Sequence, residues 1–125
     1  VYTTPIGWEI DPQGMTDWLL KLKDTAKPLY VTENGYPLPV GDAEDGERIA
    51  YLHDHLAAAL RAKEAGVDLR GYFVWTLVDN FEWAFGWRTR FGLVSLDLET
   101  FERTPKRSYG WLSDVARTRR LLPAN

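Results

Sequence analysis

The sequence contains no cysteine, so it can form neither a disulfide nor a thiolate metal site. It also has little net charge: 15 basic and 18 acidic residues leave a formal charge of −3, which gives no positive field for nucleic acid or an anionic membrane. No apolar run approaches the roughly 18 residues that a membrane-spanning helix needs. We therefore expect no nucleic-acid or membrane partner, and a cytoplasmic location.

Metal and nucleotide chemistry have little support either. The sequence has two histidines, His53 and His55. They stand two positions apart on a predicted helix, about 200° around its axis, so they cannot hold one metal ion as an i, i+4 pair could. We interpret both as surface histidines. The sequence has no phosphate-cradling glycine loop and no nucleotide fingerprint, so no cofactor is implied.

The most informative segment of the chain is residues 71–92, GYFVWTLVDNFEWAFGWRTRFG, which interleaves aromatic side chains with carboxylates. A pyranose has apolar C–H faces that stack on indole rings, and hydroxyls that need charged hydrogen-bond partners. The segment begins with a predicted strand at about residues 70–77, which is apolar at nearly every position, as is typical of a parallel strand covered on both faces. This composition favours a sugar site that follows a buried strand.

A second strand pattern lies about forty residues earlier, over 29–33, and ends in the carboxylate of Glu33. The Asn34-Gly35 pair that follows predicts a turn. In a parallel α/β barrel the C-terminal ends of the strands carry the catalytic groups, while the middles of the strands fill the core. Glu33 is therefore our leading catalytic candidate.

Helical patterns separate these strands. Helices are predicted at about residues 13–24 and 46–65, and a third from an N-cap and N1 pair at Thr104-Pro105 to about residue 118. Residues 35–47 have the glycines, prolines and acids of a long exposed loop, and 92–97 alternates as a short hairpin strand. The order β-α-β-α predicts an α/β fold with right-handed crossovers, in one domain over residues 1–125.

Two sets of side chains outside the motifs receive structural interpretations. Tryptophans more often pack in a core than bind a ligand, and we expect this of Trp8, Trp18, Trp87 and Trp111. Cations near a helix C-terminus oppose its negative dipole end. We therefore interpret Arg117, Arg119 and Arg120 as a solvated helix end.

Three motifs resemble those of one enzyme family and occur in the same order as in that family: TENG at 32–35, WTLVDNFEW at 75–83 and RFGLVSLD at 90–97. Together they resemble the C-terminal third of a family 1 glycoside hydrolase, the β-glucosidase and β-galactosidase family. The resemblance extends from residues 7–10 to residues 103–108. It implies the C-terminal part of a (β/α)8 TIM barrel, which is incomplete as a single chain of 125 residues, because a complete barrel typically needs about 250.

The resemblance also implies roles for five residues. Glu33 matches the family's nucleophile, in a retaining reaction that uses two carboxylates about 5 to 5.5 Å apart. Trp75 matches the platform under the sugar, and Trp83 the indole whose N–H reaches a glycone hydroxyl. Glu82 matches the acceptor for the hydroxyls at C4 and C6, and Phe91 an apolar wall. A carboxylate at position 82 would repel a phosphate, so it favours unphosphorylated sugars.

The family's acid/base glutamate lies in an Asn-Glu-Pro motif much earlier in the protein, and this sequence has no such motif. We therefore expect a complementary N-terminal barrel fragment as a partner, in addition to a β-glycoside substrate. The open edges of the strands also predict that this chain is ordered only beside that fragment or beside a second copy of itself. Asp79 and Asn80 are interpreted as structural residues that hold the loop before Glu82. Two alternatives stay open: a non-catalytic sugar-binding or scaffold fragment, and an excised piece without function.

Overall fold

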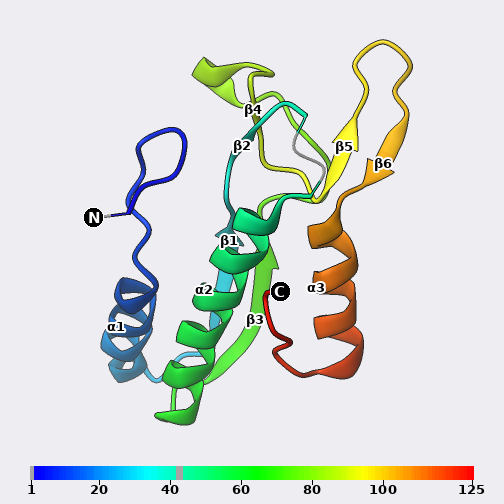
Figure 1. Cartoon of the computed structure of the whole chain (residues 1–125). Helices are drawn as coiled ribbons and strands as arrows, with labels where there is room; N and C mark the ends of the chain where they lie inside the picture. The colour runs from blue at the N-terminus through cyan, green and yellow to red at the C-terminus, as the bar shows by residue number, and fades with distance from the viewer. Residues whose placement is uncertain (1, 42–43) are drawn as a thin grey trace.

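The computed structural model describes residues 2–41 and 44–125. Strands separate the α-helices along the chain (Figure 1). The elements are α1 (Pro12–Leu22), η1 (Lys23–Thr25), β1 (Leu29–Asn34), β2 (Leu38–Pro39), α2 (Gly46–Glu64), β3 (Leu69–Val74), η2 (Trp83–Phe85), β4 (Thr89–Arg90), β5 (Val94–Leu96), β6 (Arg103–Pro105) and α3 (Arg107–Thr118). The predicted α/β class is confirmed, and the first two predicted helices and the first strand match within two residues.

Strands β1 and β3 form the parallel pair that the crossover pattern predicts, with Leu29 opposite Leu69 and Asn34 opposite Val74. Helices α1 and α2 pack against one face of this pair. The core between them is made of small and aliphatic side chains, Leu19, Ala59, Ala62, Val67 and Leu69, with Leu29, Val31 and Tyr72 packed against it. Alanines on α2 let the helices approach closely, so burial of this apolar face stabilises the unit.

The opposite face of the β1–β3 pair is uncovered. Tyr30 on β1 is 53% exposed and Phe73 on β3 is 57% exposed. Both rings lie on the same side, because each comes within 3.2 Å of the position that a Cβ of Gly71 would occupy. The prediction of a strand covered on both faces is therefore wrong for this chain. The physical reason is that the parallel sheet has only two strands in the described part of the molecule.

Beyond the C-terminal ends of β1 and β3, the chain forms two small antiparallel pairs, β2 with β4 and β5 with β6. The sequence pattern did not predict β4. The loop predicted to be exposed over 35–47 is buried at Tyr36, Pro37 and Leu38, where β2 pairs with β4. Residues 42–43 of that loop lie outside the described residues. The strand predicted at 92–97 is confirmed as β5.

The start of the last helix differs from the prediction. Thr104 pairs with Ser95, and Pro105 pairs with Val94, so both residues belong to β6. The N-cap is instead Lys106, whose backbone is extended at φ −87° and ψ 171°. Sheet pairing therefore uses the two residues that the sequence marked as a helix start.

The structural interpretations of single residues have mixed outcomes. Trp18 is 62% exposed and Trp8 51%, so the core prediction is wrong for both, whereas Trp87 and Trp111 are half-buried. His55 is buried, and its ring stacks on Tyr51 at 3.9 Å between centroids, so the surface prediction is wrong for it.

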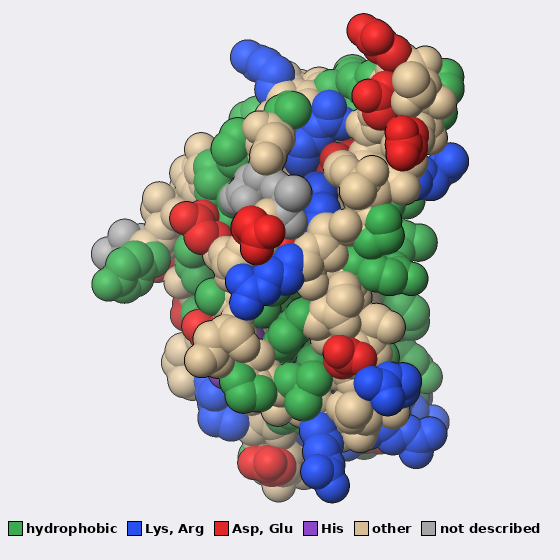
Figure 2. All heavy atoms as spheres, turned by 45° about the vertical axis from the view of Figure 1, so that its right-hand side comes forward, with side chains coloured by type: hydrophobic (Ala, Val, Ile, Leu, Met, Phe, Trp, Pro, Cys, Tyr) green, Lys and Arg blue, Asp and Glu red, His purple; other side chains and the backbone are tan. Residues whose placement is uncertain are grey.

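The three arginines at the end of α3, Arg117, Arg119 and Arg120, are exposed as predicted. Acidic and basic side chains are interspersed on the face shown in Figure 2. Within residues 2–41 and 44–125, no helix is long and apolar enough to cross a bilayer.

Candidate active site

A cavity of about 490 Å³ lies where β1 and β3 end. This volume falls in the range of small-molecule sites, about 300 to 1,000 Å³. The lining residues come from the N-terminal loop, β1, α2, and the segments that follow β3: Trp8, Glu33, Asn34, Gly35, Tyr51, Trp75, Glu82, Trp83 and Phe91. All five residues assigned from the sequence therefore line one cavity. Their chemical roles remain predictions.

Glu33 is exposed in this chain, and its neighbour Asn34 is held on both sides. The Asn34 Nδ2 donates to the Tyr51 hydroxyl at 3.1 Å, and the Tyr72 hydroxyl donates to the Asn34 Oδ1. Burial raises the pKa of Tyr51, and it raises the pKa of Tyr72 well above its usual range. Both hydroxyls therefore stay protonated near neutral pH. The end of β1, next to Glu33, is thus fixed by side chains from α2 and β3.

Trp75 is joined to the end of β1 through the backbone. Its N–H donates to the Asn34 carbonyl at 2.9 Å, and the peptide bond from Trp75 to Thr76 is cis. A Cβ on Gly35 would lie 1.8 Å from the Trp75 carbonyl oxygen, so only glycine permits this approach. The nucleophile candidate and the platform candidate therefore come from two strand ends in direct contact.

Glu82 and Trp83 lie in a tight loop after β3. The Glu82 N–H donates to the Gly86 carbonyl at 2.8 Å, and the Gly86 N–H donates to the Trp83 carbonyl at 3.0 Å. The Asn80 Nδ2 donates to the Glu82 Oε2 at 2.8 Å. The Trp83 side chain is 83% exposed. This loop presents a half-buried carboxylate and an indole ring together.

Asp79 anchors that loop to the following segment. Its Oδ1 accepts from the Gly92 N–H at 2.9 Å and from the Lys106 Nζ at 3.0 Å. A Cβ on Gly92 would lie 2.2 Å from the Asp79 nitrogen, so this contact also depends on glycine. The structural role predicted for Asp79 and Asn80 is confirmed by these hydrogen bonds.

Phe91 forms a buried wall of the cavity, with 2% of its surface exposed. Its ring centroid lies 6.1 Å from that of Trp8, which the sequence analysis placed in a core. Gly35 and Tyr51 also line the cavity, although neither was predicted to do so from the sequence. For Gly35 the signal was its place directly after Glu33-Asn34. For Tyr51 the sequence gives only a helix position, which does not reveal contact with a strand end.

The cavity suits a neutral polyhydroxylated ligand. It combines two carboxylates, Glu33 and Glu82, with the aromatic surfaces of Trp8, Trp75 and Trp83. Among the residues that the structure describes, no three histidines, acids or cysteines gather in a way that could hold a metal ion. The donors and acceptors on the cavity are therefore those of a hydrogen-bonding site.

Comparison with known proteins gives consistent results. The model of Glycosyl hydrolase family 1 matches residues 1–121. A bifunctional β-D-glucosidase/β-D-fucosidase of Bifidobacterium breve is 47% identical over an alignment of 119 positions, and the match covers 86% of this chain and 26% of that protein. A 6-phospho-β-galactosidase 1 of Streptococcus pneumoniae is 40% identical over 92% of this chain and 27% of its own length. The solved β-glucosidase of Thermotoga maritima in complex with deoxynojirimycin has a TM-score of 0.88 and 41% identity, over 98% of this chain and 30% of its own.

Proposed function

This chain belongs to glycosyl hydrolase family 1, and from that premise we propose that it supplies the nucleophile and the glycone-binding residues of a retaining β-glycosidase. The observation that carries the proposal is the single cavity at the strand ends, which Glu33 shares with Trp75, Glu82, Trp83 and Phe91. A carboxylate at the C-terminal end of a barrel strand, beside side chains suited to a sugar, would supply one of the two carboxylates that glycoside hydrolysis needs.

In the proposed reaction, the Glu33 carboxylate attacks the anomeric carbon and forms a covalent glycosyl-enzyme. A second carboxyl group, about 5 to 5.5 Å away, protonates the leaving oxygen and then activates water. Glu82 has a different role, because its Oε2 already accepts a hydrogen bond from Asn80 and its loop presents it as an acceptor. Glu82 binds the glycone hydroxyls, Trp75 lies under the ring, Trp83 donates its indole N–H, and Phe91 closes one wall.

The acid/base residue comes from a complementary N-terminal barrel segment with an Asn-Glu-Pro motif. Two observations support this part of the proposal. The chain spans only 26% and 27% of the length of the two curated relatives described above. In addition, Tyr30 and Phe73 are exposed on the face of the β1–β3 pair that points away from the helices, which leaves apolar surface for further strands to cover.

The proposed substrate is an unphosphorylated β-glycoside. The carboxylate of Glu82 repels a phosphate on the sugar and accepts hydrogen bonds from hydroxyls. The Thermotoga maritima β-glucosidase has been solved in complex with deoxynojirimycin. Overall identity does not separate the substrates, since a relative named as a 6-phospho-β-galactosidase is 40% identical. The substrate class therefore rests on Glu82.

The test uses a complemented barrel, in which this chain replaces the matching segment of the Thermotoga maritima β-glucosidase. We expect the complemented barrel to hydrolyse an aryl β-glucoside with retention, and the Glu33→Gln variant to lose on the order of 10⁴-fold or more in kcat. Glu99→Gln, which changes an exposed turn residue in the same way, should retain full turnover. Ordinary turnover in Glu33→Gln would refute the assignment of the nucleophile.

A non-catalytic sugar-binding fragment is the second candidate function. The observation in its favour concerns the carboxylates on the cavity. If Glu82 serves as a hydrogen-bond acceptor for the sugar, Glu33 is the one carboxylate that the described lining residues leave for the two roles of nucleophile and acid. A complemented barrel that binds deoxynojirimycin without turning over the glucoside would support this candidate.

A further inference from the structure

Arg48 is a buried cation, and three of its hydrogen bonds reach segments outside its own helix. Its side chain is 1% exposed, on the same face of α2 as Ile49 and Leu52. The Nε donates to the Tyr36 carbonyl at 3.1 Å, the Nη1 to the Gly92 carbonyl at 2.9 Å, and the Nη2 to the Arg90 carbonyl at 2.7 Å. All three nitrogens of the guanidinium therefore hold main-chain carbonyls of other segments.

The three carbonyls belong to the two loops that line the cavity. Tyr36 directly follows Gly35, in the segment after β1. Arg90 and Gly92 stand on either side of Phe91, whose own carbonyl accepts from the Thr76 N–H at 3.2 Å. Three consecutive carbonyls around the apolar wall are thus held, two of them by Arg48. The same side chain ties the loop after the nucleophile to the loop that carries the glycone wall.

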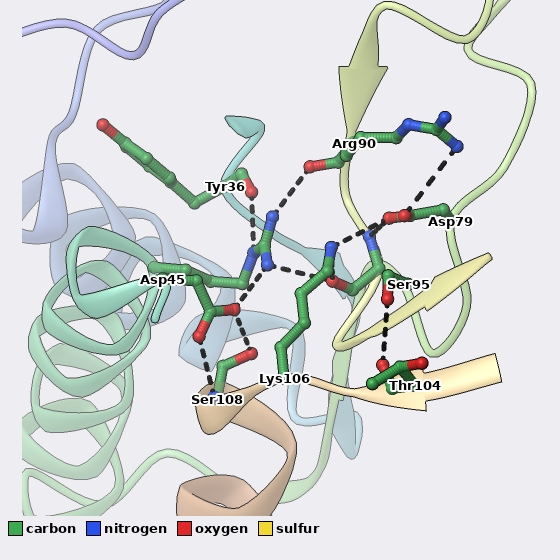
Figure 3. Close-up of polar contacts among 10 residues, drawn as sticks. Tyr36, Asp45, Asp79, Arg90, Ser95, Thr104, Lys106 and Ser108 are labelled. Carbon is green, nitrogen blue, oxygen red and sulfur yellow. Dashed lines mark hydrogen bonds and ion pairs between the residues drawn. The ribbon is translucent and has the colours of Figure 1, made fainter. Parts of the chain in front are cut away.

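A buried polar network continues from Arg48 through Asp45 and the Gly92 carbonyl (Figure 3). The Arg48 Nη1 donates to the Asp45 Oδ2 at 2.6 Å, and the Asp45 Oδ1 accepts from the Ser108 N–H at 2.9 Å. Lys106 donates to Asp79 at 3.0 Å and to the Gly92 carbonyl at 2.8 Å. Burial, and next the Arg48 charge, lowers the pKa of Lys106, which Asp79 opposes. The network thus runs from α2 to α3 and the loop after β3.

Core packing alone does not account for a cation at this position. Burial of a charge carries a large desolvation cost, and an apolar side chain would fill the site beside Ile49 and Leu52 at lower cost. What an apolar residue cannot do is satisfy three carbonyls in a fixed plane, and a lysine lacks the planar fork that reaches all three. The guanidinium is therefore required by its acceptors.

From these contacts we infer that Arg48 is a positioning residue, which sets the separation between Glu33 and the glycone wall at Phe91 without touching the sugar. The inference rests on the function proposed above for the same cavity. A shift of about 1 Å between groups that bind one substrate can cost roughly 100-fold in rate. The alternative is that Arg48 only adds stability, in which case its loss would lower the folded fraction and leave the intact sites unchanged.

The two possibilities are separated by kinetics per intact site in the complemented barrel. Sites are counted by titration with 2-deoxy-2-fluoro-β-glucosyl fluoride. For Arg48→Lys we expect a fall of at least about 10-fold in kcat/KM per titrated site, with a raised KM. The Kd for deoxynojirimycin, measured by tryptophan fluorescence, should rise by a similar factor. Leu52→Ala is the matched control, because it removes a fully buried side chain from the same helix.

Leu52→Ala should lower the thermal midpoint and keep the parent values per site. If Arg48→Lys does not fold, Asp45→Asn decides, since asparagine tolerates the left-handed backbone at φ 33° and keeps an oxygen for Ser108 while it removes the charge. Parent values of KM and Kd in the Arg48→Lys or Asp45→Asn barrel would overturn the inference, as would an equal rise in Leu52→Ala. A parent barrel that binds deoxynojirimycin but does not cleave the glucoside contradicts the proposed function alone, and the Kd comparison still decides the role of Arg48.

Discussion

Substitution of Gly35 by alanine tests whether the cavity depends on direct contact between the two strand ends. The added Cβ would lie 1.8 Å from the Trp75 carbonyl oxygen and 2.9 Å from the Trp75 carbonyl carbon. Both are backbone atoms, so no side chain can rotate away. A contact of ordinary length requires the segments after Glu33 and at Trp75 to separate by at least about 1 Å, because packed interiors have no free space to absorb the methyl group.

The structure sets the size of the expected effects. Overpacking against backbone typically costs about 1 to 3 kcal/mol, and we expect Gly35→Ala in the complemented barrel at the upper end of this range. Because Glu33 and Trp75 must act on one sugar, kcat/KM per titrated site should fall by about 100-fold. Urea unfolding measures the first quantity, and hydrolysis of an aryl β-glucoside measures the second.

Gly110→Ala is the matched control. A Cβ at Gly110, the fourth residue of α3, would have no heavy atom within 4 Å outside its own helix and chain neighbours. Alanine in a helix interior is favoured over glycine by about 1 kcal/mol, so this variant should be as stable as the parent or more stable, with unchanged kinetics. A Gly35→Ala barrel with parent stability and kcat/KM would refute the proposed contact.

Three further predictions concern the complemented barrel. Glu82→Gln should raise KM for the glucoside by about 10-fold to 100-fold, because hydrogen bonds to a charged acceptor are worth about 1.5 to 3 kcal/mol; Glu99→Gln is the control, and an unchanged KM in steady-state assays would contradict the glycone role. Phe91→Ala should lower the free energy of unfolding by about 3 to 5 kcal/mol in urea titrations, since the ring is 2% exposed, and a loss below about 1 kcal/mol would show that this wall is not packed. Burial lowers the pKa of His55 from 6.5 in the folded state, so below that pH the unfolded chain binds more protons than the folded chain. The stability that depends on neutral His55 is therefore complete above about pH 6.5 and falls as the pH drops. Thermal midpoints across pH 5 to 8 should show this fall in the parent and in His53→Gln but less of it in His55→Gln, and an identical slope in both variants would contradict the prediction.

Much of the fold could be predicted from local patterns, because a helix or strand pattern depends on residues that are close together in the sequence. The helical spacing of Ile49, Leu52 and Leu56 determines which face of α2 packs on the sheet, and the apolar runs determine β1 and β3. The start of α3 could not be predicted in this way. Thr104-Pro105 satisfies the local rule for a helix start, yet its pairing with Val94 and Ser95 in β6 prevails.

For the site, the prediction depended on residues whose neighbours in sequence are also neighbours in space. Glu33, Glu82 and Trp83 lie in short motifs, and the motifs place them on one cavity. Tyr51 and Arg48 lie on a helix, and their contacts with strand ends arise only when α2 packs on the sheet. The sequence did carry one signal for Arg48: a charged residue at helical spacing from Leu52, on the apolar face.

The tryptophans that were predicted to lie in the core show what residue type alone cannot predict. Trp18 and Trp8 are large and apolar, yet both are more than half exposed in this chain. Residue type predicts a preference for burial, but it does not say which segment supplies the cover. This chain spans about a quarter of the length of a curated relative, and we propose that other segments supply part of that cover, as for the open face of β1 and β3.

The central claim is that Glu33 is the nucleophile of a site that this chain shares with a complementary segment. The most direct test is exposure of the complemented barrel to 2-deoxy-2-fluoro-β-glucosyl fluoride, followed by intact-mass measurement and peptide mapping. Fluoride leaves with little help from a general acid, so the reagent reports on the nucleophile separately from the acid/base residue. We predict one fluoroglucosyl adduct, on the peptide that contains Glu33, and none in the Glu33→Gln variant. An adduct on another residue, or no adduct on a folded barrel that binds deoxynojirimycin, would contradict the claim.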